Sequence, residues 1–424
     1  MNTPTLGEAR FASSKSHTTS DEIRIPERIE VGADSGLQFE LAGPRANLFF
    51  DPKQTRAGIV TCGGLCPGLN NLIRSLFLEL HYGYGVAEVL GFRGGYTGLD
   101  PKCGVEPVKV TPAFVDGIHQ HGGTVLGSSR GPVDIGRAVD NLIVCNVNIL
   151  FTVGGDGTQR GAHHFYQEAR KRGHPLSVVG VPKTIDNDVG FVSRTFGFFS
   201  AVEEAKRVLD CAHTEARSVP GGIGLVKLMG RHAGFVTTGA VVASQDVNFA
   251  LVPEVPFKLQ SFLAALKERM VKKSHAVIAV AEGAGQDLLG ADATEHDASG
   301  NLKLKDIGPF LCDKIKSYFK TEGISVVIRY FDPSYQIRSR PANSEDALLC
   351  DLFARHAVHA AMAGKTGVVI GFLHERFIHV PIELLATHTK RLDPAGGWWR
   401  SVLACYRTTA TIRLSSPPEN SDYG

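Results

Sequence analysis

Short polar segments that directly follow apolar, β-branched runs carry most of the chemistry in this sequence. The first, CGGLCPGLN at residues 62–70, follows the run Ile59–Thr61 and precedes apolar residues at helical spacing. Backbone N–H groups and the helix dipole at such a glycine turn favour a phosphate group. Glycine turns between a strand and a helix also occur for purely structural reasons, so this segment alone leaves both interpretations open.

A second glycine turn, TVGGDGT at residues 152–158, contains a carboxylate. Its glycines let backbone N–H groups face an anion, but Asp156 would repel that anion unless a cation lay between them. The segment therefore predicts Mg²⁺ held by Asp156 and by phosphate oxygens. The alternative is that Asp156 caps the N-terminus of the following helix.

Two carboxylates and a lysine follow the next apolar run, in the segment VPKTIDND at residues 181–188. Asp186 and Asp188 lie two residues apart and could share a site with Mg²⁺ and Lys183. A carboxylate held beside a sugar hydroxyl can remove its proton as a general base. A polar turn without catalytic function is the alternative, but a position one strand after the Gly-Asp loop favours a site.

Arginines at two further glycine turns are candidates for binding phosphate. Arg231 ends the segment Met229-Gly230-Arg231, which follows an apolar run, and Arg130 ends the segment LGSSR at 126–130. A guanidinium can bind phosphate oxygens bidentately, which suits both positions. A single arginine is more often simply solvated, but two beside glycine turns indicate an anionic ligand.

Two more segments supply groups suited to a sugar phosphate. Residues 329–338, which read RYFDPSYQIR, follow an expected strand at 324–328 and contain two suitable arginines and a phenol. A glutamate after the apolar run 275–281 could accept hydrogen bonds from sugar hydroxyls. The candidates are Arg329, Tyr335, Arg338 and Glu282.

Two other motifs fail on spacing. Residues 363–366, AGKT, look like the end of a P-loop, but the first glycine of that loop would fall at His359. His374, Glu375 and His379 have one residue too many between them for the zinc-binding helix of a metalloprotease. We expect both segments to be structural.

The elements that must position these segments alternate along the chain. Short apolar runs are followed by stretches with helical periodicity, for example at 198–215, 258–273 and 343–363. This alternation predicts an α/β fold with mostly parallel sheets, and the length fits two of them. Because ligands bind at the carboxyl ends of parallel strands, the segments after the strands can meet at one edge of each sheet.

Composition excludes several other classes of protein. The 424 residues are 43% hydrophobic and 21% charged, as in a soluble globular protein, and a net charge of +2 gives no basic excess for nucleic acid. No apolar run is long enough for a membrane helix, and the N-terminus lacks the apolar core of a secretory signal. The eight cysteines form no Cys-x-x-Cys pair and are expected to be reduced thiols. We expect a cytoplasmic protein that binds neither nucleic acid nor membrane, with residues 1–25 and 415–424 mobile.

A Mg²⁺-binding loop, a carboxylate base and several arginines together describe phosphoryl transfer. The ordered segments CGGLCPGLN, GGDGT, PKTIDND, MGR and PEVPF resemble 6-phosphofructokinase. CGGLCPGLN, PKTIDND and DPSYQIR resemble its plant and trypanosomatid branch in particular, and the similarity runs from about residue 43 to about residue 405. The GGDGT string alone is weak, because NAD kinases and diacylglycerol kinases share it.

The resemblance implies an α/β fold of two Rossmann-like domains with the active site in the cleft between them. The implied division is an N-terminal extension (1–46), a nucleotide-binding domain (47–197 plus 338–380) and a sugar-phosphate-binding domain (198–337 plus 381–424). It further implies phosphorylation of D-fructose 6-phosphate to fructose 1,6-bisphosphate in glycolysis, with ATP and Mg²⁺. A homo-oligomer, either a dimer or a tetramer, is also implied.

The same resemblance assigns roles to the candidate residues. Asp186 is implied to be the general base for the sugar 1-hydroxyl, and Asp156 the carboxylate linked to Mg²⁺. Arg130 and Arg231 are implied to contact the transferring phosphate and the substrate. The nucleotide side comprises Gly64, Tyr96, Arg130, Gly155, Asp156, Gly157 and Thr158. The sugar-phosphate side comprises Lys183, Thr184, Asp186, Asp188, Met229, Gly230, Arg231, Glu282, Arg329, Tyr335 and Arg338.

Position 157 bears on the phosphoryl donor. Pyrophosphate-dependent members of the family resemble GGDD, and the second carboxylate crowds the space of a nucleotide α-phosphate, whereas Gly157 leaves room for ATP. Lys183 is frequent among pyrophosphate users, but the plant and trypanosomatid branch combines this glycine and lysine and uses ATP. We therefore predict ATP, with pyrophosphate as the alternative. Another kinase with a GGDGT loop and a non-catalytic sugar-phosphate sensor are more distant alternatives.

Four positions depart from patterns in the family. Gly222 stands where bacterial members have an arginine that reaches the 6-phosphate in a neighbouring subunit, which leaves the sharing of the site between subunits open. Tyr335 replaces the usual bacterial histidine, as in the plant-like branch. Arg329 stands where that branch more often has lysine, and Lys365 stands where a tyrosine is common.

Overall fold

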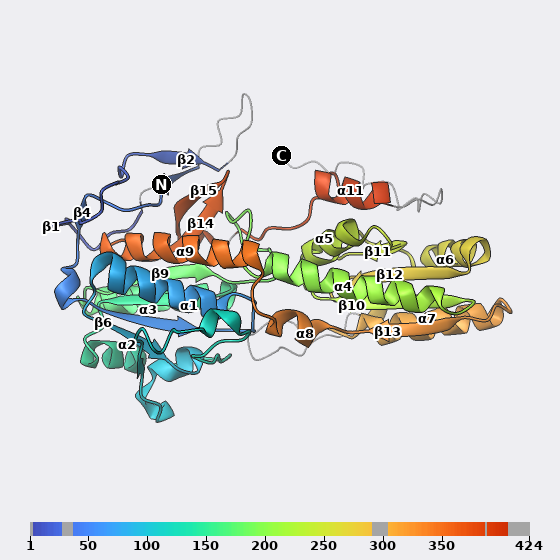
Figure 1. Ribbon diagram of the computed structural model, residues 1–424, viewed down its shortest axis with the longest axis horizontal. Coiled ribbons are helices and arrows are strands. Elements are labelled where there is room, and N and C mark those ends of the chain that lie inside the picture. Colours follow the sequence, from blue (N-terminus) through green and yellow to red (C-terminus); the bar gives the residue numbers. More distant parts are fainter. Residues whose placement is uncertain (1–2, 28–36, 291–303, 386–387, 406–424) are drawn as a thin grey trace. The chain divides into compact units, whose positions relative to one another are not determined.

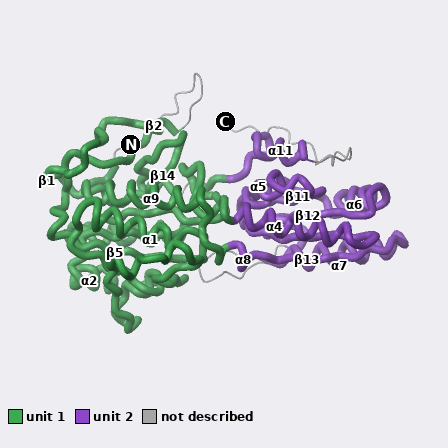
Figure 2. The backbone as a smooth tube through the Cα atoms, in the orientation of Figure 1, with its two compact units in different colours: residues 1–200, 298–300, 338–390 green, residues 201–297, 301–337, 391–424 purple. Residues whose placement is uncertain are grey.

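Two large sheets organise the chain in the computed structural model, which describes residues 3–27, 37–290, 304–385 and 388–405 (Figure 1). The chain divides into two units, each of which contains one of these sheets (Figure 2). Unit 1 comprises Met1–Ser200, Ala298–Gly300 and Arg338–Lys390, and unit 2 comprises Ala201–Asp297, Asn301–Ile337 and Arg391–Gly424. The α/β fold class is confirmed, whereas the functional domain boundaries stay a prediction.

The sheet of unit 1 has a parallel centre and antiparallel edges, in the order β2-β3-β15-β14-β9-β8-β5-β6-β7. Its central strands β8 and β9 are buried along their whole length, as expected for parallel strands covered on both faces. The strands of this sheet are β2 (Arg24–Pro26), β3 (Gln38–Leu41), β5 (Arg56–Thr61), β6 (Glu88–Phe92), β7 (Val108–Lys109), β8 (Ile149–Gly154), β9 (Ser177–Pro182), β14 (Val368–Leu373) and β15 (Arg376–Pro381).

Helices pack on this sheet in two groups: α1 lies against α9, and α3 lies against α2 and α10. The local sequence explains how α9 begins, because the Asn343 side chain accepts a hydrogen bond from the Asp346 N–H at 3.0 Å and caps the first turn. Arg170 and Lys171 in the last turn of α3 complement the helix dipole. The helices are α1 (Leu69–Leu78), α2 (Ile135–Val144), α3 (Asp156–Lys171), α9 (Ser344–Met362) and α10 (Ile382–Leu385).

The sheet of unit 2 is parallel throughout, in the order β11-β12-β10-β13. Its core includes Ile223, Ile278, Phe262 and Leu311, which come from two strands and two helices. The elements are β10 (Gly222–Leu228), β11 (Phe249–Leu251), β12 (His275–Ala281), β13 (Val327–Phe331), α5 (Phe235–Ser244), α6 (Leu259–Lys273), α7 (Ile307–Thr321) and α11 (Gly397–Cys405). Helix α4 (Phe198–Arg217) starts in unit 1 and continues into unit 2, and the short α8 (Ser334–Ser339) also contains residues of both.

One expected strand is displaced along the chain. The sequence predicts a strand at 324–328, but β13 runs from Val327 to Phe331. The reason is the register with β10, because Val327 lies opposite Gly222 and Phe331 opposite Val226. The displacement places Arg329 inside the strand rather than after it.

The N-terminal residues differ from the expectation that 1–25 are mobile. Strand β1 (Phe11–Ala12) pairs with β4 (Asn47–Leu48), and β2 pairs with β3 at the edge of the large sheet. The Leu6 N–H also donates to the Gly364 carbonyl at 2.9 Å. The described part of this segment, residues 3–27, is thus hydrogen-bonded to unit 1, and the predicted mobile segment 415–424 lies outside the described residues.

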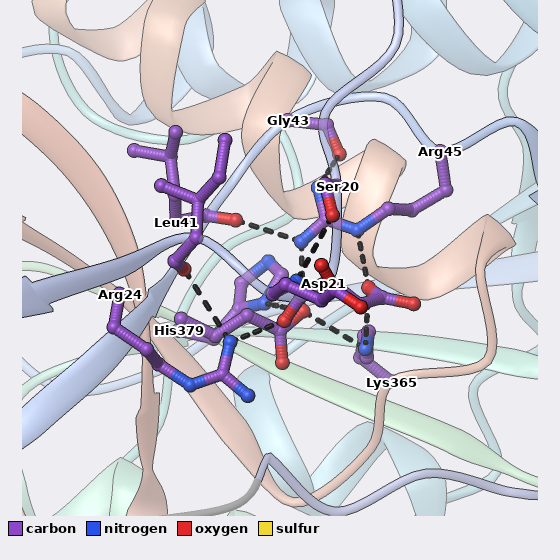
Figure 3. Close-up of polar contacts among 11 residues, drawn as sticks. Ser20, Asp21, Arg24, Leu41, Gly43, Arg45, Lys365 and His379 are labelled. Carbon is purple, nitrogen blue, oxygen red and sulfur yellow. Dashed lines mark hydrogen bonds and ion pairs between the residues drawn. The ribbon is translucent and has the colours of Figure 1, made fainter.

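A partly buried cluster of charges gives Lys365 a structural role that the sequence did not reveal. Its Nζ lies 2.8 Å from Glu40 Oε1 and 3.0 Å from Asp21 Oδ1, and Arg45 pairs with the same two carboxylates. Asp21, Arg45, Lys365 and His379 lie side by side in Figure 3. Burial opposes ionisation of Glu40, but hydrogen bonds and charge from His379 and Lys365 outweigh it and hold the pKa of Glu40 below its usual range. The cluster therefore joins the N-terminal segment to the sheet edge.

Lys365→Met is expected to destabilise the fold by about 3 kcal/mol, because it leaves the buried Glu40 carboxylate with fewer partners. Equilibrium denaturation at pH 7 measures this change. Because the pKa of Glu40 is lowered, its ionised form stabilises the folded protein fully at any pH above the usual glutamate pKa. This stabilisation is lost only as the solution becomes strongly acidic. The matched control is Lys206→Met, which removes an exposed pair with Asp210 on α4 and should cost less than about 0.5 kcal/mol. Equal losses for the two variants would contradict a structural role for the cluster.

Candidate active site

The glycine turn after β5 is hydrogen-bonded to two neighbouring segments of unit 1. The Cys62 N–H donates to the Val153 carbonyl at 2.9 Å, and the Gly63 N–H donates to the Ser129 carbonyl at 3.1 Å. The Ser128 hydroxyl donates to the Gly63 carbonyl at 2.6 Å. These bonds hold the segment that ends in Arg130 beside the turn, although more than sixty residues separate the two in sequence.

Three cationic side chains converge on this turn. The Lys183 ammonium donates a hydrogen bond to the Gly64 carbonyl. A Cβ added at Gly64 would lie 3.1 Å from Arg130 Nη2 and 3.8 Å from Arg338 Nη1, so both guanidiniums lie close to the turn. Lys183 is buried, and this burial, together with the positive charges of Arg130 and Arg338, lowers its pKa. The arrangement suits a ligand that carries several negative charges.

The second glycine turn forms the N-terminus of α3. Gly155 precedes the helix, and Asp156 and Gly157 lie in its exposed first turn. The Tyr96 hydroxyl donates to the Thr158 carbonyl at 2.7 Å, and the Tyr96 ring packs against the face of the helix at Gly161. Tyr96 and Thr158 are both buried, so they fix the start of the helix and its free N–H groups.

Gly157 has no packing reason to be a glycine. Apart from the two chain neighbours and the nearby backbone of α3, the nearest atom to a Cβ added there would be Arg160 Nη2, at an ordinary contact distance of 3.7 Å. Its φ does not lie in the left-handed region, where glycine is favoured, and the residue is exposed. A larger side chain at position 157 would therefore fit within the protein. This is consistent with a glycine that is needed for ligand binding rather than for packing.

Asp156 has an unusually high pKa for an aspartate at the protein surface. Part of the residue is exposed, but the protein atoms around the carboxyl group still desolvate it. This desolvation, and secondly repulsion from Asp188, raises the pKa of Asp156 to about 6, and Arg160 opposes the shift. A cation placed beside Asp156 would relieve both unfavourable effects.

The loop after β9 carries the candidate base in a conformation defined by its own polar groups. The Asp186 N–H donates to Thr184 Oγ1 at 3.1 Å, and the Thr184 hydroxyl donates to Asp188 Oδ1 at 3.0 Å. Asn187 has φ 54°, in the left-handed region that asparagine tolerates, and its Oδ1 accepts a hydrogen bond from the Thr195 N–H at 3.0 Å. The two aspartates thus flank a residue whose backbone and side chain are both constrained.

Unit 2 brings four of the other candidates to one edge of its sheet. The Glu282 N–H donates to the Leu228 carbonyl at 2.9 Å, and the Gly283 N–H donates to the Gly230 carbonyl at 3.1 Å. These bonds continue the pairing of β10 and β12 past their carboxyl ends. Met229, Gly230, Arg231 and Glu282 therefore lie at the same edge. Gly230 has φ 132°, so a side chain there would be strained.

The candidates of segment 329–338 are separated. Tyr335 and Arg338 lie on α8, where Tyr335 is 76% exposed. Arg329 is in the middle of β13, opposite Gly224, and its Nε lies 3.7 Å from Glu215 Oε2. The structure therefore places Arg329 away from the strand end at which Arg231 and Glu282 lie.

The structure accounts for Gly222. A Cβ at this position would overlap the carbonyl oxygen of Ala216, where the end of α4 packs on β10. An arginine cannot occupy the position without a shift of the backbone. The difference from the bacterial pattern is therefore built into the packing of unit 2.

Comparisons with known proteins show the family of the chain. A model of the phosphofructokinase family matches residues 56–361, which is most of the chain. The chain belongs to the phosphofructokinase family. Proteins named ATP-dependent 6-phosphofructokinase are 42% identical in Borreliella burgdorferi, over 93% of this chain and 91% of the relative, and 48% identical in Trypanosoma brucei brucei, over 87% and 76%. One from Arabidopsis thaliana, ATP-dependent 6-phosphofructokinase 7, is 42% identical over 95% of this chain and 84% of the relative.

Solved structures of this family confirm the fold. A protein from Marinobacter aquaeolei, described as a pyrophosphate-dependent phosphofructokinase, matches with a TM-score of 0.69 over 86% of this chain and 94% of that one. The identity is only 19%, so this likeness concerns the fold alone. The plant and trypanosomatid relatives confirm the resemblance seen in CGGLCPGLN and PKTIDND.

Two further findings concern the described residues. No described helix is long and apolar enough to cross a membrane. Among the same residues, no group of three or more His, Cys, Asp or Glu side chains could hold a metal ion by themselves. A Mg²⁺ ion at Asp156 would therefore take most of its ligands from phosphate oxygens and water, which is its usual preference in kinases.

Proposed function

We propose that this phosphofructokinase is ATP-dependent and transfers the γ-phosphoryl group of ATP to the 1-hydroxyl of D-fructose 6-phosphate, with Mg²⁺, to give fructose 1,6-bisphosphate. The observation that carries the proposal is the cationic glycine turn of Gly64, Arg130 and Lys183 in the same unit as the open helix N-terminus at Gly157. The names of relatives that are 42–48% identical support the same activity.

Each part of unit 1 has a role in this proposal. The N-terminus of α3 binds phosphate oxygens through its free N–H groups, and Arg130 and Lys183 neutralise negative charge on the transferring group. Asp186 accepts the proton of the sugar hydroxyl as that oxygen attacks phosphorus. When bound, Mg²⁺ supplies charge neutralisation between Asp156 and the phosphate chain.

Unit 2 supplies the sugar-phosphate side in this proposal. Glu282 accepts hydrogen bonds from sugar hydroxyls, and Arg231 binds phosphate. Tyr335 and, from unit 1, Arg338 are proposed as further ligands of the sugar phosphate. Arg329 is left out of the proposal, because it lies in the middle of β13 beside Glu215. We also propose that the protein is cytoplasmic and forms a homo-oligomer, either a dimer or a tetramer. Gel filtration measures the mass of this oligomer.

Product analysis tests the reaction. Incubation with ATP, Mg²⁺ and fructose 6-phosphate should yield fructose 1,6-bisphosphate, identified by phosphorus NMR, whereas NAD in place of the sugar phosphate should yield no phosphorylated dinucleotide. Phosphorylation of NAD would support another GGDGT kinase. Calorimetric binding of fructose 6-phosphate without turnover would support the sensor alternative.

The raised pKa of Asp156 predicts how Mg²⁺ dependence changes with pH. Metal binding needs the ionised carboxylate, and a pKa of about 6 leaves most of the group ionised at pH 7 and most of it protonated at pH 5. The free Mg²⁺ concentration that gives half-maximal rate should therefore be about tenfold higher at pH 5 than at pH 7, after correction for the ionisation of ATP. Initial rates over a range of free Mg²⁺ at each pH measure it. A value that does not change between pH 5 and 7 would contradict metal binding by Asp156.

A further inference from the structure

A short segment near the end of unit 1, His388–Lys390, lies across the loop that carries the candidate base. Val189 and Thr389 form an antiparallel bridge, and the Lys390 N–H donates to the Asp188 carbonyl at 3.0 Å. The Phe191 and His388 rings are 4.8 Å apart. About two hundred residues separate the segment from the loop, so no local pattern in the sequence indicates this contact.

The Lys390 side chain makes the most specific contact of this segment. Its ammonium donates to two consecutive carbonyl oxygens, Val192 at 2.7 Å and Ser193 at 3.0 Å. Burial lowers the pKa of Lys390 to about 7, and the negative charge of Asp188 opposes this effect. The two hydrogen bonds to backbone carbonyls offset part of the cost of placing this ammonium group away from solvent.

These contacts reach Asn187, the residue between the two aspartates. The Ser193 carbonyl that accepts from Lys390 lies 3.4 Å from Asn187 Nδ2, and the Asn187 Oδ1 accepts from the Thr195 N–H. Lys390 therefore holds Asp188 through its backbone N–H and Asn187 through the Ser193 carbonyl. The Thr184 hydroxyl is bonded to Asp188 in turn, and the Asp186 N–H is bonded to Thr184.

We propose that Lys390 is a positioning residue for phosphoryl transfer, which holds the loop of residues 184–195 in the conformation that aims Asp186 at the sugar hydroxyl. Lys390 acts through the loop backbone and does not itself touch the substrate. The proposal rests on the proposed function, because it assumes that Asp186 is the base. A displacement of a catalytic group by about 1 Å can cost a hundredfold in rate.

The test compares Lys390→Ala with the wild type in the same assay with ATP and fructose 6-phosphate. The variant should show a kcat that is about 10- to 100-fold lower, a KM for ATP within about twofold of the wild-type value, and a thermal midpoint close to that of the wild type. Ethylammonium added to Lys390→Ala should restore part of the lost kcat and should have no effect on the wild type. Such rescue is not expected if the lysine only stabilises the fold.

Two controls separate the possible failures. Lys53→Ala removes an exposed lysine of unit 1 outside the loop and should leave kcat unchanged. Lys390→Gln keeps a side-chain N–H donor, and its kcat is measured instead if the alanine variant does not fold. A wild-type protein without turnover overturns the proposed function and this proposal together. If the wild type is active, three results overturn the role of Lys390 alone. These are a Lys390→Ala kcat within threefold of the wild-type value, a loss of kcat that ethylammonium does not restore, and unfolding of both variants.

Discussion

Asp186→Asn is expected to lower kcat by about 10³-fold and to leave KM for fructose 6-phosphate within about threefold of the wild-type value. Asparagine has the shape of aspartate but cannot accept the proton of the attacking hydroxyl. The loop should keep its conformation, because the bonds from the Asp186 N–H to Thr184 and from the Thr184 hydroxyl to Asp188 do not involve the Asp186 side chain. Steady-state kinetics with a coupled assay measure the change.

Asp140→Asn is the matched control for this variant. Asp140 is an exposed aspartate of unit 1 that pairs with Arg172 at the surface. The same change of charge there should leave kcat unaffected and should have a negligible effect on stability. A near-normal kcat in Asp186→Asn would show that another group accepts the proton.

Gly157→Asp is expected to lower kcat/KM for ATP by about 100-fold or more. The new carboxylate would lie in the first turn of α3, where the phosphate chain is proposed to bind. Two like charges about 4 Å apart repel each other by about 4 kcal/mol at the effective dielectric constant near a protein surface, and Arg160 offsets part of that energy. Kinetics with ATP and, separately, pyrophosphate measure the effect, and the loss should be smaller for pyrophosphate because it has no α-phosphate next to a nucleoside.

Stability measurements make this variant informative. A Cβ at position 157 meets only ordinary contacts, and an acidic residue that replaces glycine in the first turn of a helix is favourable. The folded protein should therefore be as stable as the wild type or slightly more stable. Gly157→Ala adds the side chain without the charge and should keep most of the ATP activity. If Gly157→Ala lost as much activity as Gly157→Asp, space rather than charge would select the donor.

Local sequence was sufficient to predict the positions of those parts of the site that follow a strand directly. Residues 62–70, 152–158 and 181–188 each combine a buried strand with a glycine or proline turn, so their positions at the carboxyl edge follow from the strand pattern. The apolar run Ile59–Thr61 ends where β5 ends, and the apolar run 275–281 coincides with β12. The convergence of Arg130 and Arg338 on Gly64 depends on folding of the whole unit. The resemblance implied a nucleotide-side role for Gly64 and Arg130 but put Arg338 on the sugar-phosphate side.

The remaining features depend on contacts between distant parts of the chain. The register of β13 is set by pairing with β10, which moved Arg329 from the strand end into the strand. Lys365 is paired with Asp21 and Glu40, and Lys390 is bonded to the loop at 192–193, across separations that hydrophobic periodicity cannot detect. A polar N-terminal segment also gave no apolar pattern from which its pairing with the sheet edge could be predicted.

The identity of the phosphoryl donor is the central claim, and a direct comparison of two donors tests it. The wild-type protein is assayed with saturating fructose 6-phosphate and Mg²⁺, with either ATP or pyrophosphate, and the formation of fructose 1,6-bisphosphate is followed. We predict turnover with ATP and a rate at least about 100-fold lower with pyrophosphate, because Gly157 leaves the nucleotide phosphates room and adds no negative charge. Faster turnover with pyrophosphate, or no turnover with either donor, would contradict the account.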